Sequence, residues 1–182
     1  MWRFANLMDA LLSEIMVAPT IPWAVLVLRL AGALLLCGLI GLERESRDRP
    51  AGLRTHMMVG LASAVYCIVL LEMIAAFGEG EGQLRLDPVR LIEAVTSGVA
   101  FLAAGMIVFA KGEVRGLTTG TSLWLAAAVG LAVGLGLWPV AVLATILALV
   151  VVGLLKRAER AARRGESARP ASAGSGGDDR VE

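Results

Sequence analysis

Three ionisable side chains stand inside long apolar runs, where a charge is costly and usually has a function. They are Arg29, Glu72 and Glu93. If each run is a helix rising about 1.5 Å per residue, all three lie at similar depth in one half of a bilayer. An opposite charge nearby favours the ionised carboxylate, so we expect an ion pair, with Glu72 as the best partner for Arg29. A conduit for protons or cations is the alternative for the same residues.

A second group of polar residues stands at the ends of the apolar runs. Hydroxyls at a helix start suit N-capping. Arginines beside free helix N-termini could instead hold an anion or a lipid phosphate. Both interpretations stay open for this group, which we call the motif cluster and expect to converge at one membrane face: Glu43, Arg44, Arg49, Arg54, Thr55, Arg115, Thr118 and Thr119.

The sequence offers little material for catalysis or metal binding. One histidine, His56, and two cysteines, Cys37 and Cys67, cannot build a zinc site alone. We find no phosphate-cradling loop, no Ser/His/Asp constellation and no metal-ligand spacing. We therefore expect no enzyme activity, no bound metal and no cofactor. A net charge of +1 gives no reason to expect a nucleic-acid partner.

The composition is that of a membrane protein. Hydrophobic residues make up 57% of the 182 residues and charged ones only 18%, whereas soluble domains are about 45–50% apolar. A spanning helix needs about 20 mostly apolar residues. Five segments qualify: 22–42, 56–77, 91–110, 118–136 and 138–155. The expected fold is all-α, a polytopic transmembrane helical bundle with about five spans, in a bilayer.

The two ends of the chain have a different character. Apolar residues recur at helical spacing over 2–17, which predicts an amphipathic helix in the membrane interface. Residues 156–164 predict a basic helix, followed by a Gly-, Ser-, Ala- and Pro-rich tail that cannot bury a core. We therefore divide the chain into an amphipathic segment 1–20, a transmembrane domain 21–155 and a cytoplasmic tail 156–182.

The distribution of Lys and Arg predicts the direction of insertion. With five spans, 13 of these residues fall on one face and 3 on the other. Positive residues accumulate on the cytoplasmic side. We therefore expect the N-terminus outside and the C-terminus in the cytoplasm.

Small residues are dense in the third and fourth expected spans. Gly130 and Gly134 form a G-x-x-x-G, and Ala100 and Ala104 form a looser version. Such faces let helices approach closely. Packing within one chain is the favoured interpretation, and a homo-oligomer seam is the alternative.

Four ordered segments carry a family resemblance: 38–45 with 49–56, then 87–90, 97–105 and 116–124. They read GLIGLERE with RPAGLRTH, DPVR, SGVAFLAAG and GLTTGTSLW. This order and spacing resemble the MgtC/SapB family of bacterial membrane proteins. The chain departs from the family pattern on the third and fourth helices, at Ala94, Ala100, Ala103, Gly120 and Thr121.

The resemblance implies a non-enzymatic protein of the bacterial inner membrane. It implies a role in growth at low magnesium or under envelope stress, and in pathogens in survival inside macrophages, through modulation of a membrane protein partner not identified by sequence. Some relatives carry a cytoplasmic C-terminal domain, which we expect this chain to lack. A small cation or proton transporter using Arg29, Glu72 and Glu93 is the rival hypothesis, and a membrane-embedded enzyme ranks third.

Overall fold

The computed structural model describes residues 18–46, 49–77, 87–110 and 113–167. Side chains are described for all of these except 108–113 and 155–167. The amphipathic helix expected over 2–17 and the tail beyond residue 167 lie outside the described residues.

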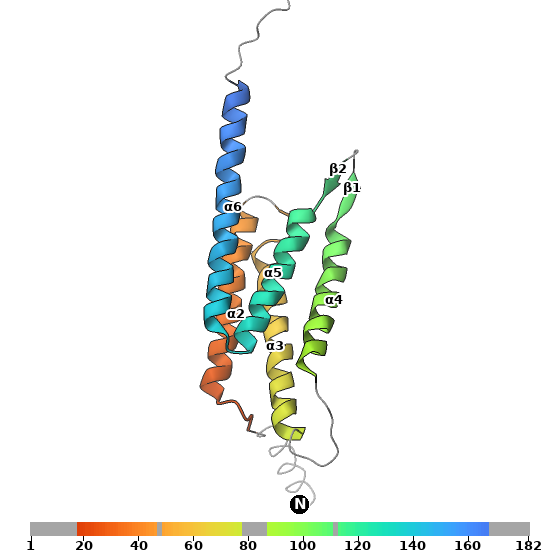
Figure 1. The fold of residues 1–182 in the computed structure, drawn as a ribbon, viewed down its shortest axis with the longest axis vertical. Helices are drawn as coiled ribbons and strands as arrows, with labels where there is room; N and C mark the ends of the chain where they lie inside the picture. Colours follow the sequence, from red (N-terminus) through yellow and green to blue (C-terminus); the bar gives the residue numbers. More distant parts are fainter. Residues whose placement is uncertain (1–17, 47–48, 78–86, 111–112, 168–182) are drawn as a thin grey trace, which may run out of the picture. The chain divides into compact units, whose positions relative to one another are not determined.

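Helices dominate this part of the chain, joined by one short hairpin (Figure 1). Four helices are long and apolar enough to cross a membrane, and the stretch Trp138–Leu154 is a shorter apolar helix. The predicted all-α bundle with about five spans is therefore confirmed. The elements are α2 (Trp23–Glu45), α3 (Leu53–Phe77), α4 (Pro88–Met106), β1 (Val108–Ala110), β2 (Glu113–Arg115), α5 (Leu117–Gly134) and α6 (Trp138–Ser167).

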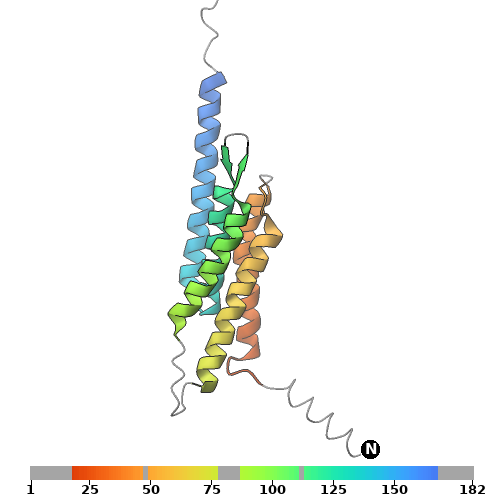
Figure 2. The ribbon, with the colours of Figure 1, turned by 90° about the vertical axis from the view of Figure 1, so that its right-hand side faces the viewer.

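Backbone contact between α3 and α5 organises the first compact unit, which extends to Thr145. A Cβ built on Gly130 would collide with the carbonyl oxygen of Gly60, and one on Gly134 would lie 2.9 Å from the carbonyl oxygen of Ala64. The G-x-x-x-G face therefore packs within the chain, as favoured from the sequence. α3 also lies against α2 on its other side (Figure 2). The buried core is accordingly rich in Ala, with few large side chains.

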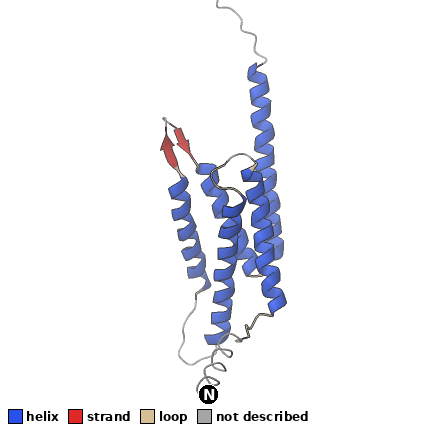
Figure 3. Cartoon of the chain, turned by 180° about the vertical axis from the view of Figure 1, so that it is seen from behind, coloured by secondary structure: helices blue, strands red, loops and turns tan. Residues whose placement is uncertain are grey.

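The connection between α4 and α5 is a hairpin that the sequence did not predict. The third span was expected to continue to Ala110, but α4 ends at Met106 and Ile107 is extended, with φ −86° and ψ 113°. Val108–Ala110 then pairs antiparallel with Glu113–Arg115 (Figure 3). Apolar and β-branched residues suit a strand as well as a membrane helix, so periodicity could not separate the two.

The turn between α5 and α6 is as short as predicted. Gly136 has φ +80°, and α6 begins at Trp138. The second compact unit begins at Ile146. In it α6 continues as one helix to Ser167, which includes the basic helix expected over 156–164.

Candidate functional site

Arg29 binds the end of a neighbouring helix. It lies half-buried on α2, and its Nη1 donates a hydrogen bond of 2.8 Å to the carbonyl oxygen of Gly134, the last residue of α5. The last carbonyls of a helix lack partners within it and carry a partial negative charge. A guanidinium has N–H donors for the unpartnered carbonyls and a positive charge that attracts their partial negative charge. Its Nε is buried and has no hydrogen-bond partner among the described residues.

Glu72 binds the segment that leads into another helix. Its Oε2 accepts a hydrogen bond of 2.8 Å from the backbone nitrogen of Thr20, and its Oε1 accepts one of 2.9 Å from Ile21. These residues directly precede α2, whose N-cap is Pro22. Pro22 donates no backbone N–H. The carboxylate therefore fixes the entry to α2 and stands near its positive end.

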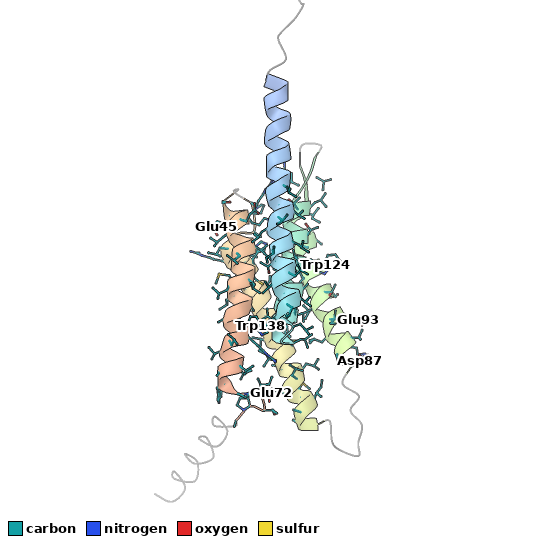
Figure 4. All side chains as sticks on the ribbon, turned by 60° about the vertical axis from the view of Figure 1, so that its left-hand side comes forward. Glu45, Glu72, Asp87, Glu93, Trp124 and Trp138 are labelled. Atoms are coloured by element: carbon teal, nitrogen blue, oxygen red, sulfur yellow. The ribbon has the colours of Figure 1, made fainter. Side chains whose placement is uncertain are left out.

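The expected ion pair between Arg29 and Glu72 is absent among the described residues. Each side chain instead compensates a helix terminus, Arg29 at the end of α5 and Glu72 at the start of α2. Glu93 is exposed on α4, a different helix (Figure 4). Depth along a helix was therefore a poor guide to partners, because helix termini compete with opposite charges for the same groups.

The opposite end of α2 is tied to α3 by another carboxylate. Oε2 of Glu45 accepts a hydrogen bond of 2.8 Å from the backbone nitrogen of Leu53, the first residue of α3. A Cβ on Gly52 would lie only 2.9 Å from that oxygen. Glu45 thus satisfies one of the free N–H groups at the start of α3. We call this end, where α2 stops and α3 and α5 begin, the motif end.

The residues of the motif cluster belong to the segments at this end and differ in burial. Nε of Arg44 lies 3.7 Å from Oε2 of Glu43, and both side chains are largely buried. Thr119 is buried on α5. The other members are exposed at their positions: Arg49, Arg54, Thr55, Arg115 and Thr118.

Neither Thr118 nor Thr119 occupies the N-cap position of α5. The N-cap is Gly116, with φ +91°, which has no side chain to cap the helix. Capping by an acidic side chain does occur at α4, where Oδ1 of Asp87 accepts a hydrogen bond of 2.9 Å from Val89. With Pro88 at the first helical position, this explains the DPVR segment as a helix start.

A buried polar chain links α3 to α5 beneath the motif cluster. His56 is completely buried, with Nδ1 2.8 Å from the carbonyl oxygen of Gly52 and Nε2 3.0 Å from Oγ of Ser122. Oγ of Ser122 is in turn 2.8 Å from the carbonyl oxygen of Thr119. Ser122 was missed from the sequence. Its spacing of three residues from Thr119, on one helix face, was the available signal.

An apolar groove of about 650 Å³ separates α3 from α4. Its lining combines larger apolar side chains with small residues on both walls, Ala62 and Ser63 on α3 and Ala94 and Gly98 on α4. Gly98 has open space where a side chain would stand. α4 is the least enclosed of the four long helices, since only 11% of its most apolar 18-residue stretch is buried.

The described residues form no recognisable metal centre. None of their His, Cys, Asp and Glu side chains gather in groups of three or more that could hold an ion. What the site residues do in this structure is join helix ends, through Arg29, Glu72 and Glu45.

Comparison with known proteins gives relatives over most of the chain. A protein of Escherichia coli (strain K12) named "Putative magnesium transporter YhiD" is 35% identical over 130 residues, 69% of this chain and 58% of that protein. Protein MgtC of Brucella abortus (strain 2308) is 42% identical over 128 residues, 70% of this chain and 50% of that protein. Protein SrpB of Synechococcus elongatus is 33% identical over 150 residues, 77% and 80% of the two chains. No solved structure matches.

The chain spans about half the length of the first two of these relatives, 58% and 50%. The model of the MgtC family matches residues 30–161, which include α3, α4, α5, the hairpin and most of α2 and α6. This range contains Glu72, Glu93 and the whole motif cluster, while Arg29 directly precedes it. The chain is a multi-pass membrane protein with bacterial relatives, and it belongs to the MgtC family.

Proposed function

We propose that this chain is a non-enzymatic protein of the bacterial inner membrane that supports growth under magnesium limitation or envelope stress by binding a spanning helix of another membrane protein. The groove between α3 and α4 is the observation that carries the proposal. Membrane helices associate by close packing of small residues, because lipid supplies no hydrophobic drive between them. This groove offers such residues on both of its walls.

The exposure of α4 supports the same proposal. Phe101 is 80% exposed and Leu102 52% exposed. A spanning helix held by few neighbours within its own chain has a face left for another molecule. The α3–α5 pair is different, since its backbones are in direct contact and leave no such room.

Orientation and setting complete the proposal. The excess of Lys and Arg on one face supports an N-terminus outside and a motif end at the cytoplasmic face. The relatives named Protein MgtC and "Putative magnesium transporter YhiD" support a link to magnesium. Because the chain covers only part of the length of these relatives, its link to magnesium is a proposal.

A small cation or proton transporter is the second candidate, favoured by the name of the Escherichia coli relative. Arg29, Glu72 and Glu93 would be its charged residues. Flux through purified protein in liposomes, measured for magnesium, potassium and protons, separates the two. Flux above that of empty liposomes would overturn the modulator proposal.

Two matched variants on α4 test the groove itself. At both Gly98 and Gly105 no atom beyond the adjacent stretch of α4 lies within 4 Å of the place where a Cβ would stand, so a side chain can leave the helix at both positions. Only Gly98 lines the groove. We expect Gly98→Trp to abolish complementation of a low-magnesium growth defect and Gly105→Trp to preserve it, at equal protein levels in the membrane. Equal growth of the two variants would reject the groove as the binding site.

A further inference from the structure

His56 is the only histidine of the chain, and its ring is completely buried between α3 and α5. The ring makes two short polar contacts, and a third extends from one of its partners. Nδ1 lies 2.8 Å from the carbonyl oxygen of Gly52, Nε2 lies 3.0 Å from Oγ of Ser122, and that Oγ lies 2.8 Å from the carbonyl oxygen of Thr119. Each contact needs one proton between its two atoms.

The supply of protons depends on the charge of the ring. Carbonyl oxygens only accept, and a serine hydroxyl donates one proton. A neutral imidazole has one N–H, so the ring and Ser122 together supply two protons for three contacts. When the single ring proton is on Nδ1, the hydroxyl of Ser122 has one proton for two acceptors, Nε2 of His56 and the carbonyl oxygen of Thr119. With the proton on Nε2, two lone pairs face each other at Gly52.

The imidazolium resolves this shortage. Its Nδ1–H donates to Gly52, its Nε2–H donates to Ser122, and the hydroxyl donates to Thr119. We propose that His56 and Ser122 form a proton-binding site that joins the start of α3 to α5 and responds to the pH at the motif end. Loss of the proton leaves one contact unmade, and therefore loosens the connection between the two helices. This role goes beyond the proposed binding of a partner helix at the groove.

The charged groups around the ring come from α2 and α3. Arg44 on α2 is the cation that acts on His56, and its charge, like the burial of the ring, opposes the imidazolium, whereas the contact with Gly52 favours it. Oε2 of Glu43 lies 3.7 Å from Nε of Arg44 and offsets part of that positive charge. On α3, Arg54 is exposed, and Glu45 of α2 is engaged with the backbone of Leu53. α5 contributes hydroxyls and has no ionisable residue in its sequence.

The position of the ring suits exchange of a proton with water. His56 is in the first turn of α3, which begins at Leu53. A proton therefore has about one helical turn, roughly 5.4 Å, to cross from the helix start. α2 closes the other side, since a Cβ on Gly41 would lie 3.0 Å from the Cβ of His56.

Nitrogen NMR of the full chain in lipid nanodiscs tests the proposal, because a single labelled histidine gives an unambiguous signal. The affinity tag must contain no histidine. Nitrogen shifts distinguish the imidazolium from both neutral tautomers. We expect a doubly protonated ring at the acidic end of the range of about pH 5–8 and a neutral ring at the alkaline end. A ring that is neutral at every pH in this range would overturn the proposal.

Variants of α5 give the matched comparison. In Ser122→Ala the remaining contact, to Gly52, is satisfied by a neutral ring, so the midpoint should fall by at least about one pH unit, a tenfold loss of proton affinity. Ser122→Cys, a weaker hydrogen-bonding partner of similar size, should also lower it, and serves if the alanine variant does not fold. Thr121→Ala removes an exposed hydroxyl that donates to the carbonyl oxygen of Thr118 and should leave the midpoint unchanged. Equal midpoints in wild type and Ser122→Cys would refute the site.

Discussion

The backbone of Gly130 on α5 lies directly against the backbone of Gly60 on α3, so that no side chain fits between them. This approach brings two helices of the first unit into close contact, and it is consistent with a core rich in small residues. Close backbone packing of this kind replaces the hydrophobic drive that is missing between helices in lipid.

The first prediction concerns that contact. Gly130→Ala should lower the free energy of unfolding by about 1–3 kcal/mol, since the added carbon forces the two backbones apart. Thermal unfolding in detergent measures the effect. Gly98→Ala is the matched control, because a side chain there meets open space and alanine favours a helix. If the two variants unfold at the same temperature, the close approach of α3 and α5 is not required for stability.

The sequence was a good guide to the spans and a poor one to what the charged residues touch. Apolar runs of spanning length and the short turn at Gly136 follow from composition and local chemistry, and both are present. The strand Val108–Ala110 was taken as helix because an apolar run carries no period that separates the two states.

The partners of individual residues depend on how each helix is rotated, which one sequence does not determine. Arg29 was expected to form an ion pair with Glu72, but the partner of its Nη1 is a backbone carbonyl at a helix end. Ser122 contacts a residue 66 positions away. The sequence alone therefore shows His56 only as an isolated histidine.

The second prediction concerns Glu45 and the start of α3. Glu45→Ala removes the acceptor for the backbone nitrogen of Leu53, which should cost about 0.5–2 kcal/mol, as for other N-terminal caps. Hydrogen exchange at the amides of residues 53–56 should accelerate. Glu45→Gln retains one acceptor oxygen and should recover part of the protection. Unchanged exchange in the alanine variant would contradict the capping role.

The third prediction concerns the direction of insertion. Single cysteines at Ala18 and Ser46, both exposed, should label from opposite sides of the membrane, with Ala18→Cys outside. The native thiols must first be removed as Cys37→Ala and Cys67→Ala, which are small changes at buried positions. Unaltered growth of the cysteine-free protein is the control. Labelling of Ser46→Cys from outside would reverse the proposed orientation.

The last prediction separates the ion pair expected from sequence from the helix-end contacts found in the structure. Arg29→Ala removes the hydrogen bond to Gly134 and should destabilise the protein by about 1–3 kcal/mol, the cost of leaving a buried polar group unsatisfied. Glu72→Gln replaces one acceptor oxygen with a donor and should weaken the contact with Thr20 or Ile21. These losses occur at different helix ends, so the double variant should lose their sum to within about 0.5 kcal/mol.

An ion pair would give a different result in the same cycle. Removing one partner of a buried pair costs more than removing both, because a lone charge is left behind. The double variant would then be more stable than Arg29→Ala alone. Free energies of unfolding in detergent decide between the two. Arg29→Lys adds a further check, since an ammonium keeps the charge but lacks the planar fork of the guanidinium. We expect it to recover only part of the loss, because Gly136 and the end of α5 are shaped around the guanidinium, whose Nη2 lies 2.9 Å from where a Cβ of that glycine would stand.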